Sequence, residues 1–182
     1  MIFQVLCLKS SIKFNNTMHK NLHNTLLFFI IPFVGFIFDF LTKYAIMQNI
    51  CIQNNIVEVL PFFNIVCVLN TGVSFGMFAG MTNGKEILLC ITFLILIVIF
   101  VLMVKEKRLL VKYSYSIIIS GAIGNIIDRL TNGGVIDFLD FHISKYHYPA
   151  FNVADSLIFI GIVLILMSDS KIFAKISNKL LT

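Results

Sequence analysis

The chain alternates between long runs of apolar residues and shorter stretches in which polar and charged residues are common. Four apolar runs cover about residues 25–47, 87–104, 113–131 and 153–168. The second run carries no charged residue, and a stretch of its length is sufficient to cross a bilayer as a helix. We therefore predict an α-helical integral membrane protein with four transmembrane helices.

The segment between the first two runs has a different pattern. Residues 56–60 and 63–69 are rich in β-branched side chains, partly alternate, and are separated by Pro61, as is typical of short strands. Residues 70–76 are rich in turn formers. We predict a small extracytoplasmic β-sheet lying on the membrane surface. Four aromatic side chains are available there to enter lipid or contact substrate: Phe62, Phe63, Phe75 and Phe78.

Composition agrees with a membrane protein and argues against a nucleic-acid partner. The chain has 182 residues, of which 58% are hydrophobic and only 13% are charged, whereas about a quarter of the residues in soluble domains are charged. The net charge is +5. The basic residues flank the apolar runs and form no basic face, so we exclude nucleic-acid binding.

The distribution of Lys and Arg predicts the orientation. Segments 1–24, 105–112 and 171–182 together hold ten of the fourteen Lys and Arg residues. Four spans place all three segments on one side, which the positive-inside rule makes cytoplasmic. We thus expect a cytoplasmic extension (1–24), a single four-helix membrane domain (25–170) with outer loops at 48–86 and 132–152, and a cytoplasmic basic tail (171–182).

Polar groups gather where this topology places the outer face. An ionisable group near lipid costs a few kcal/mol unless it is paired, hydrated or used, so such a cluster is a functional site by default. Its members are Asp39, Lys43, Asn125, Asp128, Arg129, Asp137, Asn152 and Asp155.

The residue types favour acid–base chemistry. The sequence contains no GxSxG, P-loop, Rossmann or HExxH signature, and we expect neither a metal nor a cofactor. Two aspartates that share one proton provide a base to activate water and an acid to bind a carbonyl. Chemistry alone leaves two functions open: an aspartic peptidase, or a small transporter or proton-relay subunit that uses the same acids.

Several individual roles also stay open. Asp39 and Lys43 lie four apart, so they form either a local ion pair with Lys43 extending to the interface, or a polar support for the site. Asn152 and Asp155 have the spacing of a helix-capping pair as well as of site residues.

Two further choices concern the third run and the loop after it. Asp137 and Asp140 compete for the role of the second acid. Asp128 and Arg129 are interpreted most simply as a structural ion pair that ties the third helix to its loop.

The four cysteines show no CxxC spacing. Cys51 and Cys67 fall on the outer side, where they would be able to pair, but free apolar cysteines are the favoured interpretation.

Four segments stand out in chain order: DFLTK (39–43), NTGVSF (70–75), GAIGNIIDR (121–129) continuing to GVIDF (134–138), and PAFNVAD (149–155). Taken together, they resemble signal peptidase II, the bacterial lipoprotein signal peptidase. The second segment has Ser74 where the family usually has Ala, and Tyr148 stands where Trp often precedes the Pro of the fourth.

The resemblance implies that Asp137 and Asp155 are the catalytic dyad. It also implies supporting or substrate-binding roles for Asp39, Lys43, Asn70, Asn125, Asp128, Arg129 and Asn152. The implied substrate is a prolipoprotein whose lipobox cysteine carries diacylglycerol, cut just before that cysteine. We further expect a monomer surrounded by lipid in the bacterial inner membrane, with both termini cytoplasmic.

Overall fold

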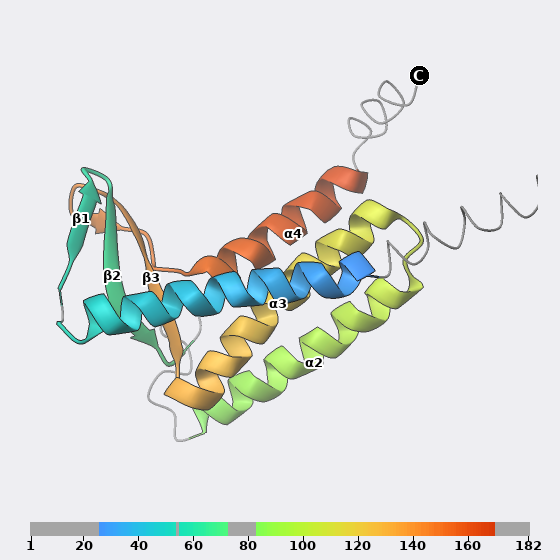
Figure 1. The fold of residues 1–182 in the computed structure, drawn as a ribbon, viewed down its shortest axis with the longest axis horizontal. Coiled ribbons are helices and arrows are strands. Elements are labelled where there is room, and N and C mark those ends of the chain that lie inside the picture. The colour runs from blue at the N-terminus through green and yellow to red at the C-terminus, as the bar shows by residue number, and fades with distance from the viewer. Residues whose placement is uncertain (1–25, 54, 73–82, 170–182) are drawn as a thin grey trace, which may run out of the picture.

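A computed structural model describes residues 26–53, 55–72 and 83–169 (Figure 1). The predicted extension 1–24, the tail 171–182, and Phe75 and Phe78 lie outside these residues. An N-terminal helix spans Leu26–Cys51 and ends in a π-helical turn, η1 (Met47–Cys51). The elements that follow are β1 (Val57–Leu60), β2 (Phe63–Asn70), α2 (Gly84–Lys105), α3 (Leu109–Asn132), β3 (Val135–Ile143), β4 (Tyr146–His147) and α4 (Val153–Asp169).

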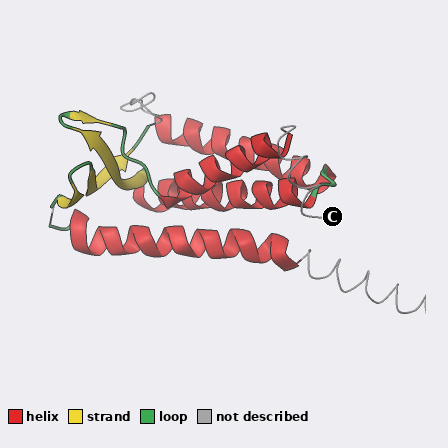
Figure 2. Ribbon diagram, turned by 90° about the horizontal axis from the view of Figure 1, so that it is seen from above, coloured by secondary structure: helices red, strands yellow, loops and turns green. Residues whose placement is uncertain are grey.

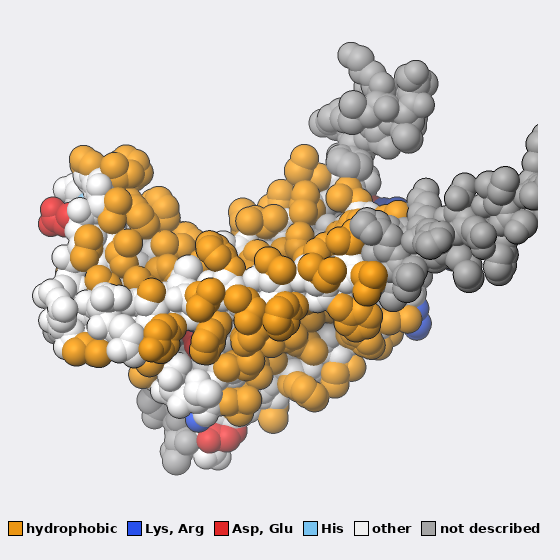
Figure 3. All heavy atoms as spheres, in the orientation of Figure 1, with side chains coloured by type: hydrophobic (Ala, Val, Ile, Leu, Met, Phe, Trp, Pro, Cys, Tyr) orange, Lys and Arg blue, Asp and Glu red, His pale blue; other side chains and the backbone are white. Residues whose placement is uncertain are grey.

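The helical character predicted from the apolar runs is confirmed. Among the described residues, three helices are long and apolar enough to cross a membrane: the N-terminal helix, α2 and α3. Apolar side chains cover much of the helical surface (Figure 3), with Phe29 72% and Leu94 63% exposed. Surfaces of this kind fit a lipid environment better than water. Helix α4 is about as apolar as α2 but is shorter, with 17 residues against 22.

Small residues on α3 allow its neighbours to approach closely. A Cβ atom added to Gly121 would overlap the backbone oxygen of Ala154, and one added to Gly124 would overlap the carboxylate of Asp39. Ser120 is fully buried and faces Gly35 of the N-terminal helix. Close helix contacts of this kind rely on small side chains in membrane proteins, so α3 forms the centre of the bundle.

The sheet lies at the end of the bundle where the N-terminal helix finishes (Figures 1 and 2). Its four strands are antiparallel in the order β1-β2-β3-β4. The two strands predicted within 48–86 are confirmed as β1 and β2. Strands β3 and β4 form within the other predicted outer loop, 132–152, where the sequence pattern had indicated no strand. The first four residues of β3 are all buried, so this strand lacks the alternation that identifies a half-exposed strand.

A β-bulge interrupts β2. Ile65 pairs with Leu139 and Val68 pairs with Asp137, so β2 advances three residues while β3 advances two. The extra residue reverses which face of the sheet each later side chain of β2 occupies. Asn64 consequently meets Asp140, whereas Asn70 reaches Asp137.

A disulfide joins Cys51, the last residue of η1, to Cys67 in the bulge, with their Cα atoms 5.2 Å apart. The prediction of free cysteines at these positions was therefore wrong. Spacing along the sequence did not show that the end of the N-terminal helix packs beside β2. Cys90 is free and exposed.

Candidate active site

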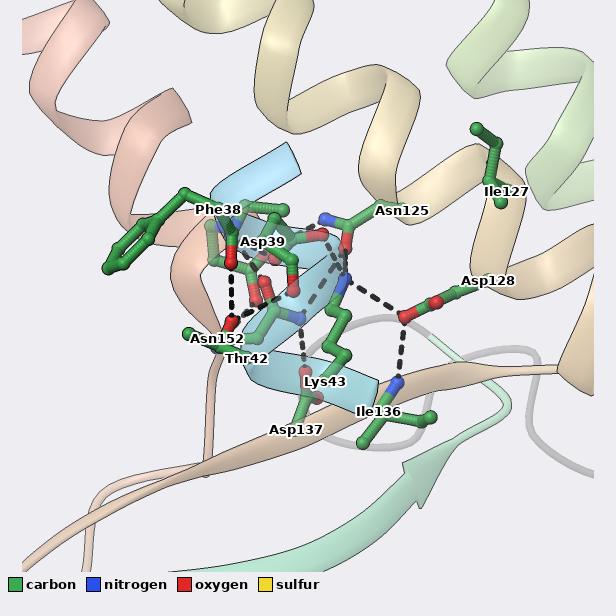
Figure 4. Close-up of polar contacts among 12 residues, drawn as sticks. Phe38, Asp39, Thr42, Lys43, Asn125, Ile127, Asp128, Ile136, Asp137 and Asn152 are labelled. Atoms are coloured by element: carbon green, nitrogen blue, oxygen red, sulfur yellow. Dashed lines mark hydrogen bonds and ion pairs between the residues drawn. The ribbon is translucent and has the colours of Figure 1, made fainter. Parts of the chain in front are cut away.

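Polar side chains from five elements converge at the junction of the helices and the sheet. Figure 4 shows the part of this cluster formed by the N-terminal helix, α3, β3 and Asn152. The N-terminal helix supplies Asp39 and Lys43, and α3 supplies Asn125, Asp128 and Arg129. Strands β2 and β3 supply Asn70 and Asp137, and the start of α4 supplies Asn152 and Asp155. Arg129 has the loosest connection, because its one hydrogen bond in the described structure is a long one to its own helix.

Lys43 contacts three other polar residues of this cluster. Its Nζ lies 2.8 Å from Oδ2 of Asp39 and 2.9 Å from Oδ2 of Asp128, and it donates a 3.2 Å hydrogen bond to Oδ1 of Asn125. Its side chain is only 3% exposed. The interpretation in which Lys43 extends to the interface was therefore wrong, and this lysine joins the N-terminal helix to α3.

The two carboxylates bound by Lys43 also receive backbone hydrogen bonds. Ala154 donates its N–H to Oδ1 of Asp39 at 2.8 Å, and Ile136 donates its N–H to Oδ2 of Asp128 at 3.2 Å. Asp39 thereby binds the first turn of α4, and Asp128 binds the start of β3. These elements carry the remaining site residues, so the ion-pair network fixes the geometry of the site.

The predicted ion pair between Asp128 and Arg129 was wrong, because Asp128 pairs with Lys43. Arg129 donates a 3.4 Å hydrogen bond to the backbone oxygen of Asn125, and its Nε is buried without a hydrogen-bond partner in the described structure. Its positive charge acts on Asp155 and Asp137.

Asp137 is buried and accepts hydrogen bonds at both oxygens. Asn152 donates to Oδ1 at 2.6 Å, and Asn70 donates to Oδ2 at 2.9 Å. Burial raises the pKa of Asp137 to about 6; the hydrogen bond from Asn70 opposes this change, and the negative charge of Asp155 adds to it. Asp137 therefore gains and loses a proton near neutral pH.

Asp155 caps α4 and belongs to the site at the same time. Its N–H donates to Oδ1 of Asn152 at 2.9 Å, while Asn152 returns its own N–H to Oδ2 of Asp155 at 3.3 Å. This is a reciprocal capping arrangement. The other oxygen, Oδ1, accepts a 2.8 Å hydrogen bond from Asn125. The two interpretations of the 152–155 spacing are thus compatible.

Asp140 lies apart from the cluster. It accepts a 3.1 Å hydrogen bond from Asn64 and lies 2.9 Å from Nδ1 of His147, a contact within the sheet. Asp137 and Asp140 are three residues apart on one strand, so their side chains leave the sheet on opposite faces. The geometry therefore separates two aspartates that the sequence left equivalent.

The arrangement suits hydrolysis by paired carboxyls. The amide of Asn152 binds Asp137 while the backbone of Asn152 binds Asp155, so one residue holds both acids in place. Within residues 26–53, 55–72 and 83–169, no three His, Cys, Asp or Glu side chains are placed to hold a metal ion. Metal-independent chemistry remains a prediction.

Residues 31–170 match the family described as signal peptidase (SPase) II. The chain belongs to the signal peptidase II family. It is 43% identical to a lipoprotein signal peptidase of Thermodesulfovibrio yellowstonii over 139 residues, which cover 76% of this chain and 91% of that protein. It is 44% identical to a lipoprotein signal peptidase of Wigglesworthia glossinidia brevipalpis over 140 residues, 76% of this chain and 90% of that protein.

Solved structures agree with this family assignment. One bacterial membrane enzyme, determined by the in meso method at 1.9 Å resolution, is 35% identical, with a TM-score of 0.69 over 79% of this chain and 92% of that chain. A second, at 2.3 Å, is 32% identical, with a TM-score of 0.66 over 84% and 90%. Signal peptidase II enzymes are aspartic peptidases, so the chain is an enzyme and the transporter alternative is not favoured.

Reasoning from the sequence missed one part of the site region and rejected another. Asn64 and His147, which contact Asp140, were missed because their proximity to it depends on strand register. The disulfide was considered and set aside, although its two cysteines are both placed on the outer side by the charge pattern.

Proposed function

We propose that this chain removes signal peptides from prolipoproteins whose lipobox cysteine carries diacylglycerol, cutting just before that cysteine. Asp137 and Asp155 act as the catalytic pair. The observation that carries this proposal is the shared contact of Asn152 with both carboxyls, which supports their acting together on one peptide bond.

In the proposed reaction the pair holds one proton. The ionised carboxylate takes a proton from a water molecule, whose oxygen attacks the carbonyl carbon of the scissile bond. The neutral carboxyl donates a hydrogen bond to the carbonyl oxygen as negative charge develops there. Collapse of the tetrahedral intermediate breaks the C–N bond, and the amine of the lipidated cysteine leaves with a proton from the pair.

The supporting residues have distinct proposed roles. Asn70, Asn125 and Asn152 orient the two carboxyls by donating hydrogen bonds to them. Asp39, Lys43 and Asp128 hold the elements that carry these asparagines. Arg129 has donor groups left for the substrate backbone near the dyad.

The pKa of Asp137 sets the expected pH dependence. Its pKa is raised to about 6, so the singly protonated pair loses its proton as pH rises through this value. We expect kcat/KM, which reports the free enzyme, to fall on the alkaline side with an apparent pKa near 6.

We further propose a four-span topology in the bacterial inner membrane, with α4 as the fourth span and the sheet and dyad at the outer face. Both termini are cytoplasmic, and the chain works as a monomer surrounded by lipid. Two independent features support this orientation. Basic residues concentrate at the opposite end of the helices, and the disulfide at the sheet end requires an oxidising compartment.

Cleavage by the purified protein tests the proposed function. We expect the enzyme in detergent to cut a lipobox peptide whose cysteine carries diacylglycerol, and to cut it equally well in excess EDTA. The same peptide without lipid is the control and should be cut far more slowly. Loss of cleavage in EDTA that added zinc or magnesium restores would contradict the mechanism, and no cleavage of the lipidated peptide would contradict the function.

Accessibility labelling tests the orientation. Lys145→Cys and Lys107→Cys are introduced separately into a background in which Cys7 and Cys90 are Ser and the disulfide is retained. A membrane-impermeant maleimide applied to intact spheroplasts should label position 145, which lies between β3 and β4, and leave position 107, between α2 and α3, unlabelled. Labelling at 107 from outside would contradict the topology.

A further inference from the structure

The Cys51–Cys67 disulfide joins two elements that carry site residues, the N-terminal helix and β2. Cys51 ends the helix that carries Asp39 and Lys43, and Cys67 lies in the β2 bulge. Cys51 lies eight positions after Lys43 along the N-terminal helix. The disulfide is therefore a covalent link between the buried ion-pair network and the strand that carries Asn70.

The position of Cys67 within the bulge matters for Asn70. The extra residue of the bulge falls between Ile65 and Val68. It reverses the face of the sheet on which the later side chains of β2 lie. Without that reversal, Asn70 would face the side of the sheet occupied by Asp140. A covalent link at Cys67 thus fixes the position of the bulge, where the side chains of β2 change faces.

Asn70 is held in a single orientation at the end of β2. Its Oδ1 accepts a 3.1 Å hydrogen bond from the N–H of Gly72, so its Nδ2 points the other way and donates to Asp137 at 2.9 Å. Asn70 is three residues from the disulfide and is the last residue of the strand, where it pairs with Val135 of β3. Its distance from Asp137 depends on the placement of β2.

We propose that the Cys51–Cys67 disulfide is a positioning element for the reaction, which locks the β2 bulge against the N-terminal helix and so holds the Asn70 amide against Asp137. The proposal rests on the proposed role of Asp137. A disulfide that only stabilised the fold would change the thermal melt and leave the titration of Asp137 unchanged. A positioning disulfide changes both.

The test compares four proteins: wild type, Cys51→Ser/Cys67→Ser, Asn70→Ala, and the triple variant that combines them. Cys90→Ser is the matched control, because it removes a thiol that is free and exposed. Removing the Asn70 donor favours the protonated form of Asp137, so the alkaline limb of kcat/KM should move to higher pH in Asn70→Ala. We expect the double-cysteine variant to move the limb in the same direction and to lower kcat by about tenfold, within the range caused by small misplacements of reacting groups.

The triple variant tests whether the disulfide acts through Asn70. If the disulfide acts through Asn70, the triple variant should show the limb of Asn70→Ala with no further shift, a non-additive result. Additive shifts, or an unshifted limb in a double-cysteine variant that melts at a lower temperature, would overturn the proposal. Wild-type enzyme reduced with a phosphine and then reoxidised provides the same comparison without substitution, and should lose and regain the wild-type limb.

A second measurement separates this proposal from the proposed function. The carbonyl band of protonated Asp137, identified by its absence in Asp137→Asn, is followed by infrared difference spectroscopy against pH without substrate. The midpoint should rise in the double-cysteine variant and stay unchanged in Cys90→Ser. A wild type that cleaves no lipidated peptide would contradict the function alone, whereas an unchanged midpoint would contradict the positioning role.

Discussion

Asp137→Asn and Asp155→Asn should each reduce cleavage of a lipidated prolipoprotein by at least about 10²–10⁴-fold, the usual worth of general acid–base assistance. Asparagine keeps the shape of the side chain but cannot take a proton from water. Each aspartate also accepts two hydrogen bonds, of which an amide can accept only one, so a small fall in Tm accompanies the loss of turnover. The measurement is cleavage by each purified variant beside a thermal melt.

Asp140→Asn is a matched control for both variants. Asp140 is buried and contacts two side chains, Asn64 and His147, so its substitution causes a comparable loss of hydrogen bonds on the other face of the sheet. It should retain most activity. Substantial turnover by either dyad variant would contradict the proposed chemistry, and an inactive Asp140 variant beside an active Asp137 variant would mean that the acid is Asp140.

Lys43→Met should be the most destabilising single substitution in the site. It leaves Asp39 and Asp128 buried beside each other without their shared cation. Breaking a buried ion pair from one side typically costs about 3–5 kcal/mol, which corresponds to a fall in Tm of roughly 10 °C for a chain of this size. Thermal unfolding in detergent measures it, with the yield of folded protein as a second readout.

Two further variants serve as comparisons for the stability of Lys43→Met. Lys107→Met removes an exposed lysine from the loop between α2 and α3 and should leave Tm nearly unchanged. Asp39→Asn added to Lys43→Met removes one of the two orphaned charges while keeping an oxygen for the Ala154 N–H, so it should recover part of the stability. A Lys43→Met protein as stable as wild type would show that the network contributes little.

The sequence predicted those features that depend on local pattern. Long apolar runs indicated the helices, because lipid demands continuous apolar segments whatever their neighbours are. Ser116, Ser120 and Gly124 lie at four-residue spacing in the sequence, and the last two lie at close helix contacts of α3. The polar residues of the site, except Asn70, were found because charged groups are rare in such a chain and their placement at one depth is informative. Asn70 was indicated only by the resemblance.

Features set by pairing between distant segments were not predictable in the same way. Lys43 was assigned a local partner because four residues is a helical spacing, and its second partner, Asp128, is known only once the helices are packed. Strand β3 was missed since both of its faces are covered. The bulge in β2, which determines whether Asn64 or Asn70 faces the dyad, has no signature in single-residue propensities.

The capping arrangement at the start of α4 has a consequence for conformational entropy. Asp155 loses its rotamer freedom when the helix forms, because both of its oxygens are already occupied by Asn152 and Asn125. That ordering belongs to folding, and it does not have to be repeated when substrate binds. Substrate binding therefore carries no ordering cost for the Asp155 side chain.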